Sequence, residues 1–331
     1  MNKFKPLIFI LIFAVISCSN KERKPLLPTI AGRAGDVTLV LNDVAWNAEV
    51  GDEFRRIFGN KFVMLPQYEP VFDIIHVTHN TFGNVFKSQR NIVIAEISPH
   101  HKKPKIAAGK DIWAKPQLVI SLYGADDNAI VALLKKHENR IIQMLEDMER
   151  KRLMDIYMKN QDRAIALKMQ DEHKISLNIP KGYKLDVDSS DFVWLNQESG
   201  SKIQGIIIYH YDYTDENTFT SEYLISKRDE FLKKYLSGTI KESIMTTEKE
   251  FNPVFLQYSL RGKRYVTELR GLWKMEGGIM MGGPFVSITT LDEKRNRIVT
   301  VEGFVYAAGY KKRNLVRQLE AIIYSLGVIE H

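Results

Sequence analysis

The sequence has 331 residues, of which 44% are hydrophobic and 26% are charged, which is ordinary for a globular protein and enough for two domains. The net charge of +7 is scattered in short clusters along the chain, whereas nucleic-acid-binding proteins concentrate basic residues on one face. We therefore expect no nucleic-acid partner.

The first eighteen residues have the layout of a secretory signal. Lys3 and Lys5 form a positive head, an uncharged apolar run follows over residues 7–16, and the small Ser17 precedes Cys18. The apolar run is shorter than the about 20 residues that a membrane-spanning helix needs. The last four residues, VISC, resemble the lipobox of bacterial lipoproteins. This resemblance implies that residues 1–17 are a signal peptide and that Cys18 carries the lipid at the start of the mature chain.

Acylation of Cys18 would give the protein a membrane partner. At about 0.8 kcal/mol per buried methylene, one acyl chain holds weakly, whereas two or three hold firmly. Because the chain has no other cysteine, acylation would also exclude disulfides, iron–sulfur clusters and thiol catalysis. The alternatives are a signal cut elsewhere or a cysteine in a short buried helix. We expect a protein that is lipid-anchored in the bacterial cell envelope, on the periplasmic or outer-membrane side.

Residues 18–35 contain prolines and glycines among charged residues and are predicted to be a flexible, lipidated tether. A first domain is predicted over residues 36–160. Its β-rich segments are residues 37–41, part of 68–76, 91–98 and 117–123, and a polar loop is predicted over 100–110. Apolar residues at helical spacing predict a helix over residues 46–58 and a long amphipathic helix from about residue 126 to residue 157.

A second domain is predicted over residues 161–331. Strands are expected over residues 174–179, 192–196, 203–211, 253–261, 265–273, 285–291 and 297–307. One helix, capped by Thr218, Thr220 or Ser221, is predicted to run to about residue 236, and a last helix covers residues 312–325. Both halves therefore end on an amphipathic helix after a set of strands. The predicted fold class is α+β, with two domains that are each a mostly antiparallel sheet packed by amphipathic helices.

Few residues are arranged for chemistry. His76 and His79 follow an apparent strand, where a three-residue step points side chains to opposite faces, so a metal-binding pair is disfavoured. Asp186, Asp188 and Asp191 lack the glycine and the distal glutamate of a calcium loop and are expected in turns. A Gly-x-Ser-x-Gly nucleophile elbow is absent from the sequence. We predict no catalytic residue, no metal and no cofactor.

One segment, residues 271–284 with Phe285 directly downstream, is a candidate for binding because it combines paired glycines with methionines. Glycines permit positive φ and close backbone approach, and methionines form an adaptable apolar surface. The structural interpretation is a long hairpin connection whose apolar tip packs on the other domain. The functional interpretation is an apolar lip of a ligand or partner site. Its members are Trp273, Gly277, Gly278, Met280, Met281, Gly282, Gly283 and Phe285.

Three features of the chain occur together in one family: the lipobox, the segment from Trp273 to Phe285, and Lys312-Arg313-Asn314 at the start of the last helix. With these features the chain resembles an uncharacterised lipoprotein family of Bacteroidetes-type bacteria, known as a domain of unknown function. The resemblance implies an envelope location and supplies no catalytic residue.

A weaker resemblance concerns the second half. Residues 175–180, Gly182-Tyr183 and the closing helix resemble the α/β/α sandwich of photosystem extrinsic proteins and related bacterial lipoproteins. That fold implies a binding or stabilising role, although a fold does not fix a function.

These observations favour a non-catalytic binding or accessory role for an envelope lipoprotein, with an unknown ligand or an unknown envelope protein as its partner. The alternative is an envelope hydrolase acting on glycan, lipid or peptide, with a site between the two domains. A carboxylate pair in a groove, or a histidine bonded to Ser or Asp, would favour the hydrolase. A purely structural role would require a broad exposed apolar patch.

Overall fold

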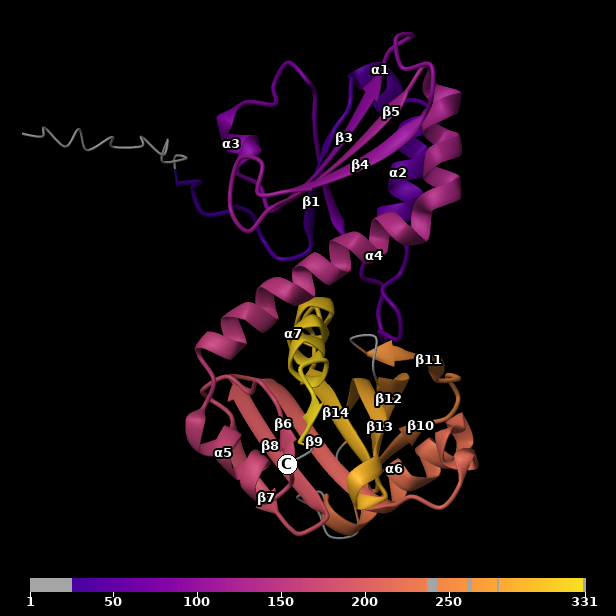
Figure 1. Ribbon diagram of the computed structural model, residues 1–331. Coiled ribbons are helices and arrows are strands. Elements are labelled where there is room, and N and C mark those ends of the chain that lie inside the picture. Colours follow the sequence, from indigo (N-terminus) through magenta and orange to yellow (C-terminus); the bar gives the residue numbers. More distant parts are fainter. Residues whose placement is uncertain (1–25, 237–242, 261–263, 279, 330–331) are drawn as a thin grey trace, which may run out of the picture.

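The computed structural model describes residues 26–236, 243–260, 264–278 and 280–329; Cys18 and the signal peptide lie outside these ranges. Figure 1 shows two α+β parts, and the long helix α4 (Asp127–Lys159) runs from the first to the second. The predicted α+β class in two parts is confirmed, and strand pairing over the described chain is mostly antiparallel. Among the described residues, no helix has the length and apolar character needed to cross a membrane.

The first sheet has the strand order β2-β1-β3-β5-β4. Its pairings are parallel except that β4 runs antiparallel to β5, so the expectation of a mostly antiparallel sheet does not hold for this domain. Buried side chains on both faces explain the difference, because strands covered on both sides are typical of parallel sheets. The strands are β1 (Asp36–Val40), β2 (Asp73–Val77), β3 (Asn91–Ile97), β4 (Lys105–Lys110) and β5 (Leu118–Gly124).

The helices of the first domain begin at short polar caps. The helix expected over residues 46–58 is divided into α1 (Asp43–Trp46) and α2 (Glu49–Gly59), and the Asn42 side chain caps α1 by accepting from the N–H of Ala45 at 2.8 Å. A short α3 (Asn84–Lys87) precedes β3. Asp126 caps α4, and non-helical dihedral angles at His137 bend this helix within the first domain.

The second sheet is antiparallel throughout, in the order β10-β12-β13-β14-β9-β8-β7, with β11 paired to β12 beside β10. A small second pair joins β6 and β15. The strands are β6 (Ile175–Ser176), β7 (Lys184–Asp188), β8 (Phe192–Ser199), β9 (Lys202–Asp212), β10 (Ile244–Glu248), β11 (Val254–Leu260), β12 (Arg264–Glu276), β13 (Gly282–Asp292), β14 (Arg297–Ala307) and β15 (Gly327–Val328).

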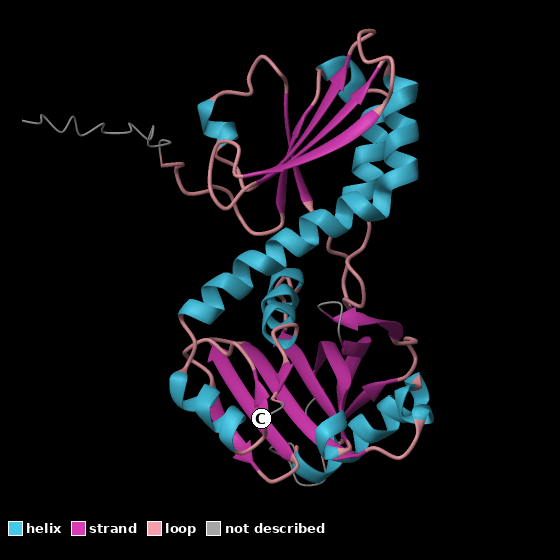
Figure 2. Cartoon of the chain, viewed as in Figure 1, coloured by secondary structure: helices cyan, strands magenta, loops and turns pink. Residues whose placement is uncertain are grey.

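Helices cover both faces of this sheet, as the cartoon in Figure 2 makes visible. Along β14, Val301 and Val305 belong to the core under α7 (Arg313–Ile323), whereas Phe304 belongs to the core under α6 (Ser221–Tyr235). Short helices α5 (Arg163–Asp171), η1 (Glu216–Phe219) and η2 (Glu293–Arg295) complete the domain.

Three local predictions were wrong. The polar loop expected over residues 100–110 contains the edge strand β4, and the strand expected over residues 174–179 is only the two-residue β6. The flexible tether predicted over residues 18–35 is bonded to the first domain from Pro28, because Lys115 N donates to its carbonyl at 2.8 Å and Ala31 N donates to Ser88. Strand β4 begins and ends with lysine, so its sequence resembles a polar loop. Charged residues, lysine especially, are typical of strands at the edge of a sheet.

Candidate functional site

The Gly- and Met-rich segment joins β12 to β13: its first residues end β12, and its last residues begin β13. Gly277 and Gly278 make the turn with φ of 70° and 88°, which other residues rarely adopt. Gly282 and Gly283 belong to β13, and a Cβ at Gly283 would meet the carbonyl oxygen of Val305 at 2.0 Å. These glycines are therefore explained by the hairpin itself.

Most side chains of this segment are core residues. Trp273 and Phe285 are buried, and Trp273 Nε1 donates to the Val305 carbonyl at 3.1 Å. Met281 packs against the core under α6, so the predicted packing on the other domain is not observed for the described methionines of this segment. Met280 is the one large apolar side chain described in the segment that is strongly exposed, at 94%, and one such side chain does not make a binding surface.

The two domains are joined by a carboxylate of the first domain that caps a helix of the second. Glu69 is buried and accepts hydrogen bonds from the backbone N–H groups of Lys312, at 2.6 Å, and Arg313, at 3.0 Å. Helix α7 has no side-chain cap of its own. A negative charge at a helix N-terminus satisfies free donors and interacts favourably with the helix dipole. Glu69 therefore fixes α7 against the first domain.

Arginines of α7 extend this interface. Arg313 donates to the Pro70 carbonyl and pairs with Asp73 at 2.8 Å, and Arg317 donates to the Val71 carbonyl at 2.8 Å. In the other direction, Phe62 and Leu65 of the first domain belong to the core of the second. A loop of the first domain thus descends onto the second (Figure 1).

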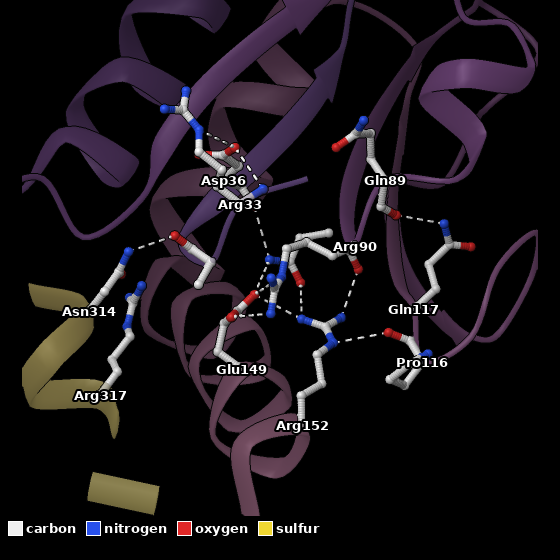
Figure 3. Close-up of polar contacts among 12 residues, drawn as sticks. Arg33, Asp36, Gln89, Arg90, Pro116, Gln117, Glu149, Arg152, Asn314 and Arg317 are labelled. Carbon is white, nitrogen blue, oxygen red and sulfur yellow. Dashed lines mark hydrogen bonds and ion pairs between the residues drawn. The ribbon is translucent and has the colours of Figure 1, made fainter. Parts of the chain in front are cut away.

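A second buried network holds the middle of α4 to the first sheet. Figure 3 shows Glu149 between Arg90 and Arg152, and Glu149 accepts from both arginines at 2.8 Å. Asn91 donates to Glu149 at 2.7 Å and accepts from Arg152 at 2.9 Å. Each charge has a partner, so this cluster positions α4 and leaves no free group for a ligand.

Between the domains lies a cavity of about 670 Å³, here called the interdomain pocket. Five elements build it: the first-domain loop, α4, the strands β11 and β12, and α7. Its lining residues are Phe62, Val63, Val71, Ile142, Gln143, Glu146, Asp147, Arg150, Leu256, Gln257, Tyr258, Glu268, Arg270, Glu320 and Tyr324. An adjoining hollow of about 320 Å³ shares Phe62 and Val63.

One wall of the interdomain pocket is a tight charged cluster. Arg270 bonds Glu268 and Glu320, and Glu268 also accepts hydrogen bonds from the hydroxyl groups of Tyr258 and Tyr324. Burial would raise the pKa of Glu268, but Arg270 and these hydrogen bonds outweigh it and lower the pKa. Glu268 therefore stays ionised and fully occupied.

The charged side chains that α4 contributes to the pocket have fewer partners than this cluster. Glu146 has only Arg317 as an ion-pair partner, at 3.7 Å, and accepts no hydrogen bond from a described residue. Burial raises its pKa, and the nearby Glu320 raises it further. Arg150, one turn along α4, bonds Asp147 at 2.9 Å, but its buried Nε has no hydrogen-bond partner among the described residues.

A second candidate cluster lies around His173, directly after the C-terminal end of α5. His173 Nε2 lies 2.9 Å from Asp188 Oδ1, and with Glu172 these residues form the one group in the described chain whose atoms could hold a metal. However, Lys168 Nζ already contacts Asp188 at 2.6 Å and Glu172 at 2.8 Å. The lysine ammonium thus occupies the position that a metal cation would need. Among the described residues, no serine bonds His173 to complete a catalytic triad.

The other predicted positions have structural roles. His76 stacks on Trp46 at 4.4 Å and lies 2.9 Å from the Leu41 carbonyl, while His79 pairs with Glu96. Asp186 and Asp188 lie in β7 rather than in turns.

Comparison with known proteins divides the chain into two segments. Residues 31–158 match the family model described as "Domain of unknown function (DUF8532)", and residues 162–325 match that described as "Domain of unknown function (DUF4837)". The chain is thus made of two domains that each match an uncharacterised domain family. No curated protein matches the sequence.

Among solved structures, a crystal structure from Bacteroides thetaiotaomicron VPI-5482 is similar at 10% identity and a TM-score of 0.26. The similarity covers 48% of this chain and 46% of that chain, so it spans less than half of the neighbour's length.

Proposed function

We propose that the protein is a lipid-anchored lipoprotein of the bacterial cell envelope that binds a small molecule in the interdomain pocket without transforming it. The observation that carries the binding role is this pocket, which both domains build and which contains apolar, aromatic and polar groups. Ligand sites are typically concave, mostly apolar and situated between domains. The lipobox-like sequence ending at Cys18 supports the anchor. Together with two domains of uncharacterised families, it supports membership of a Bacteroidetes-type lipoprotein family.

Binding is favoured over catalysis because the charged groups around the pocket are largely committed to one another. Arg270 holds two carboxylates, and Glu268 receives three partners. A catalytic group must be free to exchange protons or electrons with a substrate. The cluster instead gives the pocket a fixed shape.

The test uses the full-length protein, extracted from envelopes in detergent and examined by native mass spectrometry. Val63 lines the pocket and is half-exposed, so Val63→Trp fills the cavity without disturbing the core. Val85→Trp is the matched control, because Val85 is exposed on α3 away from the pocket. We expect a bound small-molecule mass on the wild type and on Val85→Trp, but not on Val63→Trp. Equal occupancy of all three proteins, or none on the wild type, would contradict the proposal.

The alternative function, hydrolysis of an envelope glycan, lipid or peptide, is favoured by one feature. Glu146 has a raised pKa and Glu268 a lowered one, and both line the same cavity. Carboxyl groups with pKa values pushed apart are typical of acid–base catalysis. Release of soluble fragments from purified peptidoglycan, lost in Glu146→Gln, would support this alternative for a glycan. No difference between wild type and variant would exclude it for that substrate.

A further inference from the structure

The charges around the interdomain pocket do not balance. Four carboxylates line it, those of Glu146, Asp147, Glu268 and Glu320, against two guanidinium groups, those of Arg150 and Arg270. Arg317 lies behind the wall and contacts Glu146 at 3.7 Å, which still leaves an excess of negative charge. A pocket with an excess of negative charge attracts a cation.

Glu146 is the acidic group that is least satisfied. Its one charged partner, Arg317, already donates to the Val71 carbonyl at 2.8 Å with the same nitrogen that faces Glu146. The raised pKa of Glu146 has the same origin, since burial and Glu320 both disfavour its charged form. A positive group next to Glu146 would remove this penalty.

Aromatic and aliphatic side chains supply the apolar surface of the pocket. Guanidinium groups of the protein already lie over two of these rings: the guanidinium carbon of Arg150 lies 4.2 Å from the centre of the Tyr324 ring, and that of Arg317 lies 5.3 Å from the centre of Phe62. Val63, Ile142 and Leu256 add apolar surface for the rest of a ligand.

The pocket offers few free donors to bind an anionic ligand. Arg270 is shared by Glu268 and Glu320, and Arg150 bonds Asp147. Two further guanidinium nitrogens, Arg150 Nε and Arg317 Nη1, have no partner among the described residues, but both are buried and so are not accessible to a ligand.

We propose that the interdomain pocket selects ligands that carry a protonated amine on an apolar body, with Glu146 as the counter-ion of the amine. This inference rests on the proposed binding function and specifies its ligand class.

Three probes of the same shape separate the charge states: 2-phenylethylamine, the neutral 2-phenylethanol, and phenylacetate. Binding to the full-length protein is measured by saturation-transfer NMR titration at pH 7. We expect the amine to bind about tenfold more tightly than the alcohol and phenylacetate to bind least. Glu146→Gln should weaken amine binding about tenfold and leave alcohol binding unchanged.

The matched control is Asp155→Asn, which removes one negative charge from the same helix at a half-exposed position outside the pocket. It should leave the preference for the amine intact. Equal amine binding to wild type and Glu146→Gln, a preference for phenylacetate, or no binding of the amine would each overturn the inference. Alcohol or phenylacetate binding that Val63→Trp abolishes would preserve the proposed function and contradict only the amine preference. The native mass spectrometry of the wild type, Val63→Trp and Val85→Trp tests the proposed binding function without these probes.

Discussion

The carboxylate of Glu69 and the backbone N–H of Arg313 form a 3.0 Å hydrogen bond across the domain boundary, 244 residues apart in sequence. A second bond, to the N–H of Lys312, uses the other carboxylate oxygen. These donors belong to the first turn of α7, where no intrahelical acceptor is available. The relative position of the domains, and hence the shape of the interdomain pocket, therefore depends on a helix cap supplied by the other domain.

We expect Glu69→Ala to destabilise α7 by about 2 kcal/mol, because it removes two charge-assisted hydrogen bonds and a favourable interaction with the helix dipole. Hydrogen exchange measures the effect directly at the Lys312 and Arg313 amides, which should lose protection.

Glu49→Ala is the control for that substitution. Glu49 also lies in the first turn of a helix, α2, but its carboxylate pairs at the exposed surface with Lys135. Its loss should change the free energy of unfolding by less than about 1 kcal/mol. Unchanged exchange of the Lys312 and Arg313 amides in Glu69→Ala would show that the cap does not stabilise α7.

Much of the second domain could be predicted from sequence because its elements follow local rules. Strand β14 occupies the residues 297–307 that its pattern predicts, and Thr220 caps α6 as its type and position indicate. In the first domain, the nearly continuous apolar runs of β1 and β3 were a signal for parallel pairing. Strand order remained out of reach because it depends on contacts between distant segments.

The interdomain pocket could not be predicted for the same reason. Glu146 and Glu320 lie on helices 174 positions apart in the sequence, and neither stands in a motif. Glu69 likewise lies in an irregular segment between two prolines, where no local sequence pattern indicates that it caps a helix of the other domain. The composition of the Gly- and Met-rich segment fits a hairpin connection as well as a binding loop, so the sequence does not distinguish the two.

A buried ion pair under α6 gives a second prediction. Arg228 and Glu302 are both fully buried and form two hydrogen bonds of 2.7 Å, with the Arg228 guanidinium 3.8 Å from the centre of the Phe285 ring. Arg228→Met leaves Glu302 without its counter-ion in the core. We expect it to lower the free energy of unfolding in urea by about 3–5 kcal/mol.

The double replacement Arg228→Met/Glu302→Met should cost less than the Arg228→Met change alone, since no uncompensated charge remains. Lys227→Met is the control at the neighbouring position, where the lysine pairs with Glu230 near the surface, and it should cost less than about 1 kcal/mol. A double variant that is less stable than Arg228→Met would show that the ion pair itself is strongly stabilising.

The proposed anchor predicts the location of the protein. Cys18→Ser removes the thiol that acylation requires, so the chain should move from the membrane fraction to the soluble fraction of disrupted cells, because no acyl chain remains to hold it. Ser19→Ala, at the next residue, should stay with the membrane. Membrane sedimentation of Cys18→Ser equal to that of the wild type would contradict lipid anchoring at this residue.

The pH dependence of stability should report Glu146. Its pKa in the folded protein is raised above the ordinary glutamate value of 4.5, with burial as the largest cause. Between 4.5 and the folded pKa, the folded state therefore binds more protons than the unfolded state. Stability must fall as pH rises through this window and stay lower above it. Glu146→Gln, which cannot ionise, removes this loss.

We therefore expect Glu146→Gln to be more stable than the wild type at pH 8 and to lose that advantage near pH 4, when urea unfolding is measured at intervals between these values. Asp155→Asn should show no such pH-dependent gain, because Asp155 is half-exposed and its one ion-pair partner among the described residues is Lys151. Saturating 2-phenylethylamine should reduce the gain at pH 8, since an ammonium beside Glu146 stabilises the ionised wild type and not the variant. A difference in unfolding free energy between Glu146→Gln and wild type that stays constant across this pH range would contradict the prediction. It would mean that Glu146 has an ordinary pKa and is not a site where a ligand cation is favoured.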